Sequence, residues 1–254
     1  MKIIFMGRKQ CSADLLKWTV EQGIDVDSVV TDSHLAASPT AKIAGSLGIP
    51  VVGLSDVETK LSQTDHGIDL VVSNLFWKKI KEPVISGPKY GCINFHPAIL
   101  PKWRGTAGYN VAILNKLDQW GATAHYVDSG IDTGEIIKQY KFDFDYRIET
   151  AKTLEEKTLK IQNDLYKSVL LDVMENGKLE STTQNEEEGI YVSRAEMEAM
   201  KQLDLDKDDI DLKIRAFWFP PYDGANIEVN GKKYTLINSF ILKSLVDENT
   251  TFQL

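Results

Sequence analysis

The sequence predicts an α/β fold: a Rossmann-like, mainly parallel sheet with helices on both faces, followed by a small C-terminal subdomain that contains a β-hairpin. Three observations predict it. Short β-branched runs alternate with helical patterns through the first half of the chain, as in parallel βαβ units. Residues 68–73 are mostly apolar, as in a strand covered on both faces. Near the C-terminus, Asn230-Gly231 separates two strand-like arms, which is typical of a tight hairpin.

The strands expected in the sheet are short apolar segments bounded by turn residues. In chain order they are residues 2–6, 26–31, the segment around 51, 68–73, 91–95, 122–127 and 135–141. Gly7 ends the first strand, and a segment dense in turn formers, residues 128–134, separates the last two.

Helical patterns lie between and after these strands. They cover residues 12–22, 39–47, 109–117 and 150–175. We expect Ser12 to cap the first helix, because a serine hydroxyl accepts from the free N–H groups of a helix start. Pro39 lies in the first turn of the second helix and Gly48 ends it. The longest helix carries an apolar stripe from Leu154 to Leu170 opposite a charged face.

The character of the sequence changes at Gly177. Residues 178–188 are polar and acidic without periodicity, which is typical of a linker or an exposed loop. We therefore expect one domain over residues 1–177 and a small C-terminal subdomain with the hairpin over residues 178–254.

Composition restricts the classes of partner. Lysine and arginine number 29 against 37 aspartates and glutamates, a net charge of −8, which disfavours binding to nucleic-acid backbones. Two cysteines, Cys11 and Cys92, are too few for a disulfide framework or a cysteine zinc site, and they favour a cytoplasmic location. No apolar stretch approaches the roughly 20 residues that span a membrane. We thus expect neither a nucleic-acid nor a membrane partner.

Asn94 and His96 lie two residues apart near the end of a predicted strand, so they share one face. Ligand sites of open α/β sheets lie at the carboxyl ends of strands, which makes this pair a candidate polar site. On the residues alone, a capping asparagine and a partly buried histidine fit the pattern equally well.

Asp132 lies between two glycines in the turn at residues 130–134, which lets its carboxylate approach another strand end. A carboxylate near an imidazole raises the basicity of the ring and holds its orientation. We expect Asp128, in the same stretch, to stabilise the turn through a backbone hydrogen bond.

Two motifs carry a family resemblance. Asn94-Phe-His-Pro-Ala-Ile-Leu-Pro-Lys-Trp-Arg-Gly105 and His125-Tyr-Val-Asp-Ser-Gly-Ile-Asp-Thr-Gly-Glu-Ile-Ile137 resemble the formyltransferases that use 10-formyltetrahydrofolate. These include methionyl-tRNA formyltransferase, glycinamide ribonucleotide transformylase and the sugar N-formyltransferases. The resemblance runs from Met1 to about Leu170, and it favours a functional over a structural role for Asn94, His96 and Asp132. It implies a catalytic domain over residues 1–177, a folate formyl donor and no metal.

The resemblance also implies catalytic roles. Formyl transfer through a tetrahedral intermediate needs a neutral amine, a route for its proton, and donors for the developing oxyanion. Asn94 would donate its amide to the formyl oxygen. His96 would take the amine proton or share in oxyanion stabilisation, and Asp132 would orient His96.

The segment Val71-Val-Ser-Asn-Leu-Phe-Trp-Lys-Lys-Ile80 resembles the pterin-binding loop of the family. Phe76, Trp77 and Ile80 would wall the cofactor pocket, and Lys78 would bind the cofactor or a pyrophosphate. Without the family, Phe76 and Trp77 would be expected in the core.

The tail bears on the acceptor. Residues 214–225 and a short hairpin are similar to the bacterial sugar N-formyltransferases, which implies a dTDP-linked 3- or 4-amino-dideoxysugar acceptor and a role in lipopolysaccharide O-antigen biosynthesis. Three alternatives are open: a methionyl-tRNA formyltransferase-like enzyme, a UDP-amino-arabinose formyltransferase, and a non-catalytic folate- or nucleotide-binding module. Against the first, its larger RNA-binding domain has no room in 254 residues.

A nucleotide-sugar acceptor needs an aromatic ring for the base and cations for the pyrophosphate. The candidates are Lys102, Trp103, Arg104, Gly105, Thr106, Tyr109, Phe217 and Tyr222. Tyr222 is favoured for stacking, whereas Phe217 and Trp218 are equally expected to anchor the tail. Arg215 is expected in a structural ion pair. The hairpin, with its β-branched and aromatic arms, predicts a homodimer.

Overall fold

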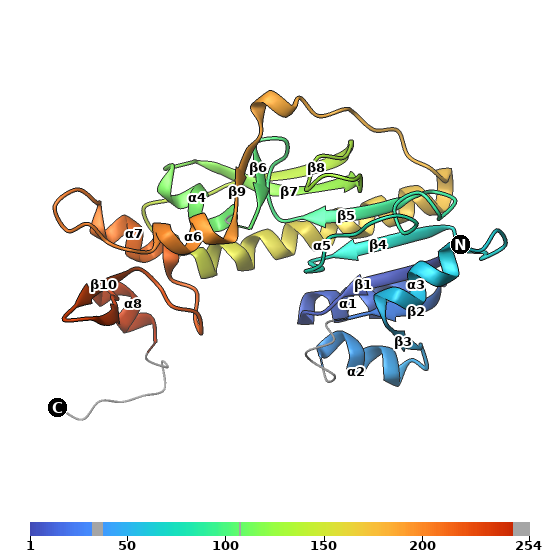
Figure 1. The fold of residues 1–254 in the computed structure, drawn as a ribbon, viewed down its shortest axis with the longest axis horizontal. Helices are drawn as coiled ribbons and strands as arrows, with labels where there is room; N and C mark the ends of the chain where they lie inside the picture. The colour runs from blue at the N-terminus through green and yellow to red at the C-terminus, as the bar shows by residue number, and fades with distance from the viewer. Residues whose placement is uncertain (32–37, 107, 246–254) are drawn as a thin grey trace. The chain divides into compact units, whose positions relative to one another are not determined.

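The computed structural model describes residues 1–31, 38–106 and 108–245 (Figure 1). Its main sheet has seven strands in the order β3-β2-β1-β4-β5-β7-β8. Their bounds are β1 (Lys2–Gly7), β2 (Asp25–Val30), β3 (Val51–Val52), β4 (Leu70–Asn74), β5 (Cys92–His96), β7 (Gln119–Tyr126) and β8 (Ile136–Asp143). The strands from β3 to β5 pair in parallel, and β7 runs antiparallel to β5. The sheet confirms the predicted fold class.

Alternate residues of the strands face two separate hydrophobic cores, as the two-residue period of a strand requires. On β1, Ile3 and Phe5 pack with α1 (Gln10–Glu21) and α5 (Ala151–Asn176). Ile4 and Met6 lie in the other core, with α3 (Leu54–Leu61). Helices therefore cover both faces of the sheet, although the sequence patterns did not predict α3.

Ser12 does not cap the first helix, contrary to expectation. The helix α1 begins earlier, at Gln10, and the buried Ser12 hydroxyl donates to the carbonyl of Asn74 at the end of β4, at 3.1 Å. Gly7 packs so closely here that a Cβ atom on it would lie 2.8 Å from the Ser12 Cβ. The side chain of Ser12 thus ties the helix to the sheet. In α2 (Pro39–Ser46), by contrast, the expected Pro39 start is confirmed.

The predicted hairpin is present. Its strands are β10 (Asn226–Val229) and β11 (Lys232–Thr235), which pair antiparallel. Asn230 and Gly231 have φ angles of 52° and 71°, the pair of left-handed residues that a two-residue type I′ turn uses.

The remaining elements are short. They are α4 (Gly108–Leu114), η1 (Glu186–Glu188), α6 (Arg194–Met200), α7 (Ile210–Phe217), α8 (Ser239–Ser244), β6 (Trp103–Gly105) and β9 (Ile190–Val192). The last two pair in a small sheet of their own. No helix among the described residues is long and apolar enough to cross a membrane.

The chain divides into two compact units. The first comprises Met1–Arg104, Gly121–Lys141 and Thr158–Ile190; the second comprises Gly105–Trp120, Phe142–Lys157 and Tyr191–Leu254. The polar segment 178–188 therefore belongs to the first unit, while the domain boundary after Gly177 stays a prediction.

Candidate active site

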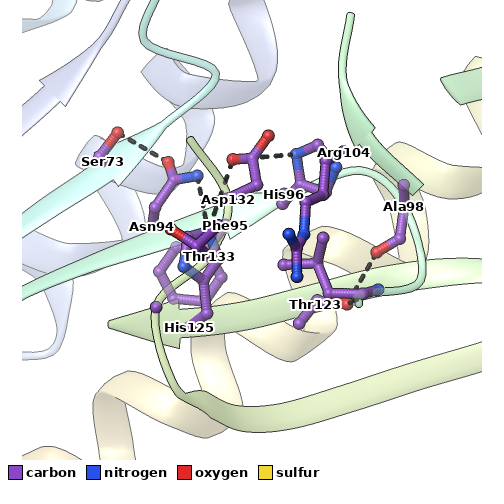
Figure 2. A network of polar contacts seen from close by, with 12 residues as sticks. Ser73, Asn94, Phe95, His96, Ala98, Arg104, Thr123, His125, Asp132 and Thr133 are labelled. Carbon is purple, nitrogen blue, oxygen red and sulfur yellow. Dashed lines mark hydrogen bonds and ion pairs between the residues drawn. The ribbon is translucent and has the colours of Figure 1, made fainter. Parts of the chain in front are cut away.

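Strand β5 presents Asn94 and His96 on one face, as their spacing predicted. Ile93, which precedes Asn94, and Phe95, which lies between Asn94 and His96, point into the core on the other face. The neighbouring strands add polar side chains at the same level, because Ser73 of β4 and His125 of β7 lie in register with Asn94. Figure 2 shows the resulting cluster at the carboxyl end of β5.

The amide of Asn94 has its orientation fixed from both sides. The hydroxyl of Ser73 donates to Asn94 Oδ1 at 2.8 Å, and Asn94 Nδ2 donates to His125 Nε2 at 3.2 Å. His125 accepts there because its Nδ1 donates to the carbonyl of Tyr126 at 2.7 Å. Burial lowers the pKa of His125 to about 4, so the ring is neutral at neutral pH. These contacts use one of the two Asn94 N–H groups.

His96 and Asp132 face each other across the site. His96 Nε2 donates to the carbonyl of Trp103 at 2.9 Å, and His96 Nδ1 lies 3.6 Å from Asp132 Oδ1. The same carboxylate oxygen is 3.7 Å from His125 Nε2, and the Asp132 side chain is 14% exposed. With Nε2 donating to a carbonyl, Nδ1 carries the lone pair of a neutral His96 ring. Nδ1 is therefore the atom that can accept a proton, and Asp132 stabilises the resulting cation.

The turn that carries Asp132 has an unusual backbone. Asp132 has a φ angle of 54°, in the left-handed region that residues other than glycine rarely adopt. Asp128 Oδ1 accepts from the Gly130 amide at 2.9 Å and from the Thr133 hydroxyl at 2.7 Å, which confirms its expected structural role. Gly134 packs against β7, since a Cβ atom on it would lie 1.8 Å from the carbonyl oxygen of Tyr126.

The loop after His96 is held by Thr123 of β7. The Thr123 hydroxyl donates to the carbonyl of Ala98 at 2.7 Å, and it accepts from the Leu100 amide at 3.1 Å and from Gln139 Nε2 at 2.9 Å. These bonds set the course of the loop that ends at Trp103 (Figure 2).

The predicted acceptor residues on this loop differ in exposure. Trp103 is buried, and Lys102 Nζ lies 5.3 Å from the centre of its ring. Arg104 is half-buried and donates to Gln184 Oε1 at 3.3 Å. In the second unit, Gly105 has a φ angle of 88° and lies close to Val192, whose carbonyl accepts from the Thr106 amide at 3.2 Å.

The predicted cofactor residues follow β4 directly. Ile80 is buried in a core cluster, and Phe76 packs against that cluster. Trp77 is 41% exposed, so the residue-only expectation of a core position does not hold for it. Lys78 Nζ lies 4.8 Å from the centre of the Trp77 ring. Because β4 and β5 are neighbours in the sheet, this loop starts beside the strand end that carries Asn94.

The other predicted acceptor residues lie in the second unit. Phe217 is 1% exposed, as expected of an anchor, whereas Tyr222 is 62% exposed. Tyr109 lies half-buried on α4. Arg215 is buried and pairs with Asp211 at 3.0 Å, which confirms the expected ion pair.

The sequence profile of the family described as formyl transferase matches residues 1–170 of this chain. The chain belongs to the formyl transferase family. Its curated relatives include the methionyl-tRNA formyltransferases of Halothermothrix orenii and Thermotoga neapolitana, which are 30% and 27% identical to it. Each match covers 98% of this chain and 82% of the relative.

Solved structures with the same fold include two N-formyltransferases. The enzyme of Helicobacter canadensis, in complex with folinic acid and dTDP-3-aminofucose, has a TM-score of 0.76 at 23% identity and covers 91% of this chain and 85% of its own. A 4-N formyltransferase of Francisella tularensis has a TM-score of 0.77 at 24% identity, with coverage of 92% and 96%.

Several polar residues around the site of this formyl transferase escaped sequence reasoning. They are Ser73, Thr123, His125, Gln139 and Gln184. Two of them had a sequence signal: Ser73 lies in the segment that resembles the pterin-binding loop, and His125 opens the second motif. Within the described chain, no group of three or more histidine, cysteine, aspartate or glutamate side chains is placed to hold a metal ion.

Proposed function

We propose that this formyl transferase moves the formyl group of 10-formyltetrahydrofolate to the amino group of a dTDP-linked amino-dideoxysugar. The observation that carries the reaction is the convergence of an amide donor, Asn94 Nδ2, with the His96–Asp132 pair at one strand end. These are the parts that attack of an amine on a formyl carbon requires: an oxyanion donor, a base, and a group that holds the base.

The geometry supports one chemical role for each of these three residues. The acceptor nitrogen forms a bond to the formyl carbon, and the bond from that carbon to the donor nitrogen breaks. Asn94 donates its remaining N–H to the formyl oxygen as negative charge develops on it. His96 takes the proton of the attacking amine at Nδ1 and returns it to the departing nitrogen, with Asp132 stabilising the charged ring between the two transfers.

The loop after β4 fits a folate donor. A pterin needs an apolar wall and backbone groups along its edge, and Phe76 and Trp77 offer partly exposed aromatic surface beside the strand end. We assign Phe76, Trp77, Lys78 and Ile80 to this pocket, with Ile80 supporting the wall from the core. Two relatives in structure, the Helicobacter enzyme and a sugar 3N-formyl transferase, were crystallised with folate derivatives.

A sugar acceptor is supported by three observations. The Helicobacter canadensis N-formyltransferase, which has a similar fold, was crystallised with dTDP-3-aminofucose. The net charge of −8 disfavours a tRNA. The exposed ring of Tyr222 is suited to stack on a base, and Lys102 and Arg104 supply charge for a pyrophosphate. A cytoplasmic location and a role in O-antigen synthesis are part of this proposal.

The acceptor is tested with a panel. Purified protein is given 10-formyltetrahydrofolate with dTDP-linked 3-amino and 4-amino dideoxyhexoses, UDP-amino-arabinose, or charged initiator tRNA, and released tetrahydrofolate is measured. We expect turnover with one dTDP-linked sugar. Turnover with the tRNA or the UDP sugar alone would overturn the acceptor but keep the reaction, and no turnover with any of them would overturn the reaction.

Methionyl-tRNA formyltransferase activity is the second candidate, because the curated relatives named above carry that name over 98% of this chain. Turnover of the charged initiator tRNA in the same panel would identify this activity. Its rate should fall strongly as the salt concentration rises.

We also propose that two copies of the chain associate through the hairpin β10–β11. All four residues of β11 are exposed, including Tyr234, and Val229 of β10 is exposed as well. A two-stranded sheet is marginal by itself, and pairing with a second copy would cover these side chains.

Sedimentation velocity tests the association. We expect a dimer at micromolar concentration for the native chain and a monomer for Tyr234→Glu, which places a charge in the covered surface. Glu228→Lys changes the charge of the same hairpin without altering Tyr234, and as a control it should remain dimeric. A native chain that sediments as a monomer would refute the dimer.

A further inference from the structure

The turn that carries Asp132 is held by a side chain from a distant part of the chain. Gln184 Nε2 donates to the carbonyl of Asp132 at 3.1 Å and to the carbonyl of Gly134 at 2.5 Å. Gln184 is only 8% exposed. Asp132 has a backbone conformation in the left-handed region, which a residue other than glycine keeps only where neighbouring groups hold it. The side-chain amide of Gln184 is one such group, because it donates to the carbonyl of Asp132 itself.

Gln184 is itself held in place by the segment around it. The amide and carbonyl of Thr182 exchange hydrogen bonds with those of Ile136, each at 2.8 Å. The hydroxyls of Ser181 and Thr183 both donate to the carboxylate of Glu135, at 2.5 and 3.2 Å. The polar segment that resembles a linker in sequence is therefore fixed in register against the start of β8.

The other end of the Gln184 amide reaches the loop beside His96. Gln184 Oε1 accepts from Arg104 at 3.3 Å, and Arg104 follows Trp103, whose carbonyl accepts from His96 Nε2. Farther along the same segment, the Ile190 amide donates to the carbonyl of Lys102 at 2.7 Å. One side chain thus joins the backbone that carries Asp132 to the guanidinium of Arg104, the residue that follows the Trp103 carbonyl bound by His96.

We propose that Gln184 is a positioning residue that sets the separation of the Asp132 carboxylate from His96 Nδ1. This assignment rests on the proposed function in one respect: it takes His96 and Asp132 to act in formyl transfer. Gln184 lies outside residues 1–170, the region that the family profile matches.

A glutamine suits this place for a chemical reason. Two carbonyl oxygens require an NH₂ group with two hydrogens, and the Arg104 guanidinium requires an acceptor. An amide supplies both at the end of one side chain. Glutamate would set a third oxygen against the two carbonyls, and asparagine is one methylene too short to keep all three contacts.

The test combines kinetics with NMR signals of the His96 ring. Gln184→Met keeps the length of the side chain and removes its hydrogen bonds, and Gln184→Asn keeps the amide and shortens the reach. We expect kcat for formyl transfer to fall about tenfold to a hundredfold in both variants, because a misplacement of about 1 Å can cost that much, with KM for the donor unchanged. In ¹⁵N-histidine NMR spectra at one fixed pH, the His96 ring signals should move in both variants, in the same direction as in Asp132→Asn, because the carboxylate beside His96 Nδ1 moves in the first case and loses its charge in the second.

Asn185→Ala is the matched control, since it removes the hydrogen bonds of the exposed neighbouring side chain to Glu187 and Glu188, which are not among the bonds that hold Gln184 or the Asp132 turn. It should leave kcat and the His96 ring signals unchanged. A folded Gln184 variant with native kcat and native His96 ring signals would overturn the positioning role. The NMR measurement needs no acceptor, so it decides the role of Gln184 even if the native chain transfers no formyl group.

Discussion

His96→Ala is expected to lower kcat for formyl transfer by about 10²- to 10⁴-fold, the range that a general base contributes. His96 Nδ1 is the ring atom that can accept the amine proton, because Nε2 donates to the carbonyl of Trp103. The donor pocket is assigned to another loop, so the affinity for folinic acid, measured by fluorescence quenching, should change little.

The pH dependence adds a second measurement for His96. The native rate should rise with pH as the general base and the attacking amine lose their protons, and then reach a plateau. A rate that is constant from about pH 6 to about pH 9 would contradict a base role for His96. His66→Ala is the control: His66 precedes β4, at the amino end of the strand, and its ring bonds the carbonyl of Gly87 instead.

Asn94→Ala is expected to lower kcat by about 10²- to 10³-fold, the loss measured when one oxyanion donor is removed from a preorganised site. Ser73 and His125 fix the amide before substrate binds, so no reorganisation is needed when charge develops. Asn94→Asp keeps the shape but turns the donor into an acceptor, and it should lose at least as much activity. Folinic acid affinity should persist in both, whereas an equal loss of binding and turnover would favour a non-catalytic binding module.

The loss caused by Asn94→Ala should be the same at each pH from about 5 to about 9. The His125 ring that orients Asn94 has a pKa lowered to about 4 by burial, so it stays a neutral acceptor over that range. A ratio of native to variant rate that follows a titration within the range would contradict this account. Ser73→Ala removes one neutral hydrogen bond to the same amide and should cost about tenfold or less.

The site residues that could be predicted from the sequence are marked by patterns in their immediate neighbours along the chain. The spacing of Asn94 and His96 places them on one face once β5 is recognised, and the glycines around Asp132 permit its turn. The hairpin was equally local, because Asn230-Gly231 determines the turn type by itself.

The parts that were missed depend on contacts between distant segments. Serine is a common helix-capping residue, but Gly7 and Asn74 lie close to Ser12, and its hydroxyl donates to the carbonyl of Asn74 instead. Thr123 and Gln184 have no periodic pattern that distinguishes them from solvated polar residues. Their partners are carbonyl groups, which every residue has, so only the folded chain reveals which ones they bind.

The fixed segment at residues 181–190 also bears on how such enzymes can diversify. Recombination can give an enzyme a new C-terminal segment that binds a new acceptor. The change of composition at Gly177 marks a crossover point that the sequence alone would favour. A crossover there would replace Gln184 together with the backbone pairing that holds it beside Asp132. A crossover beyond Ile190 would exchange the tail and keep the bonds between Gln184 and the Asp132 turn, and these bonds extend beyond the region that the family profile matches.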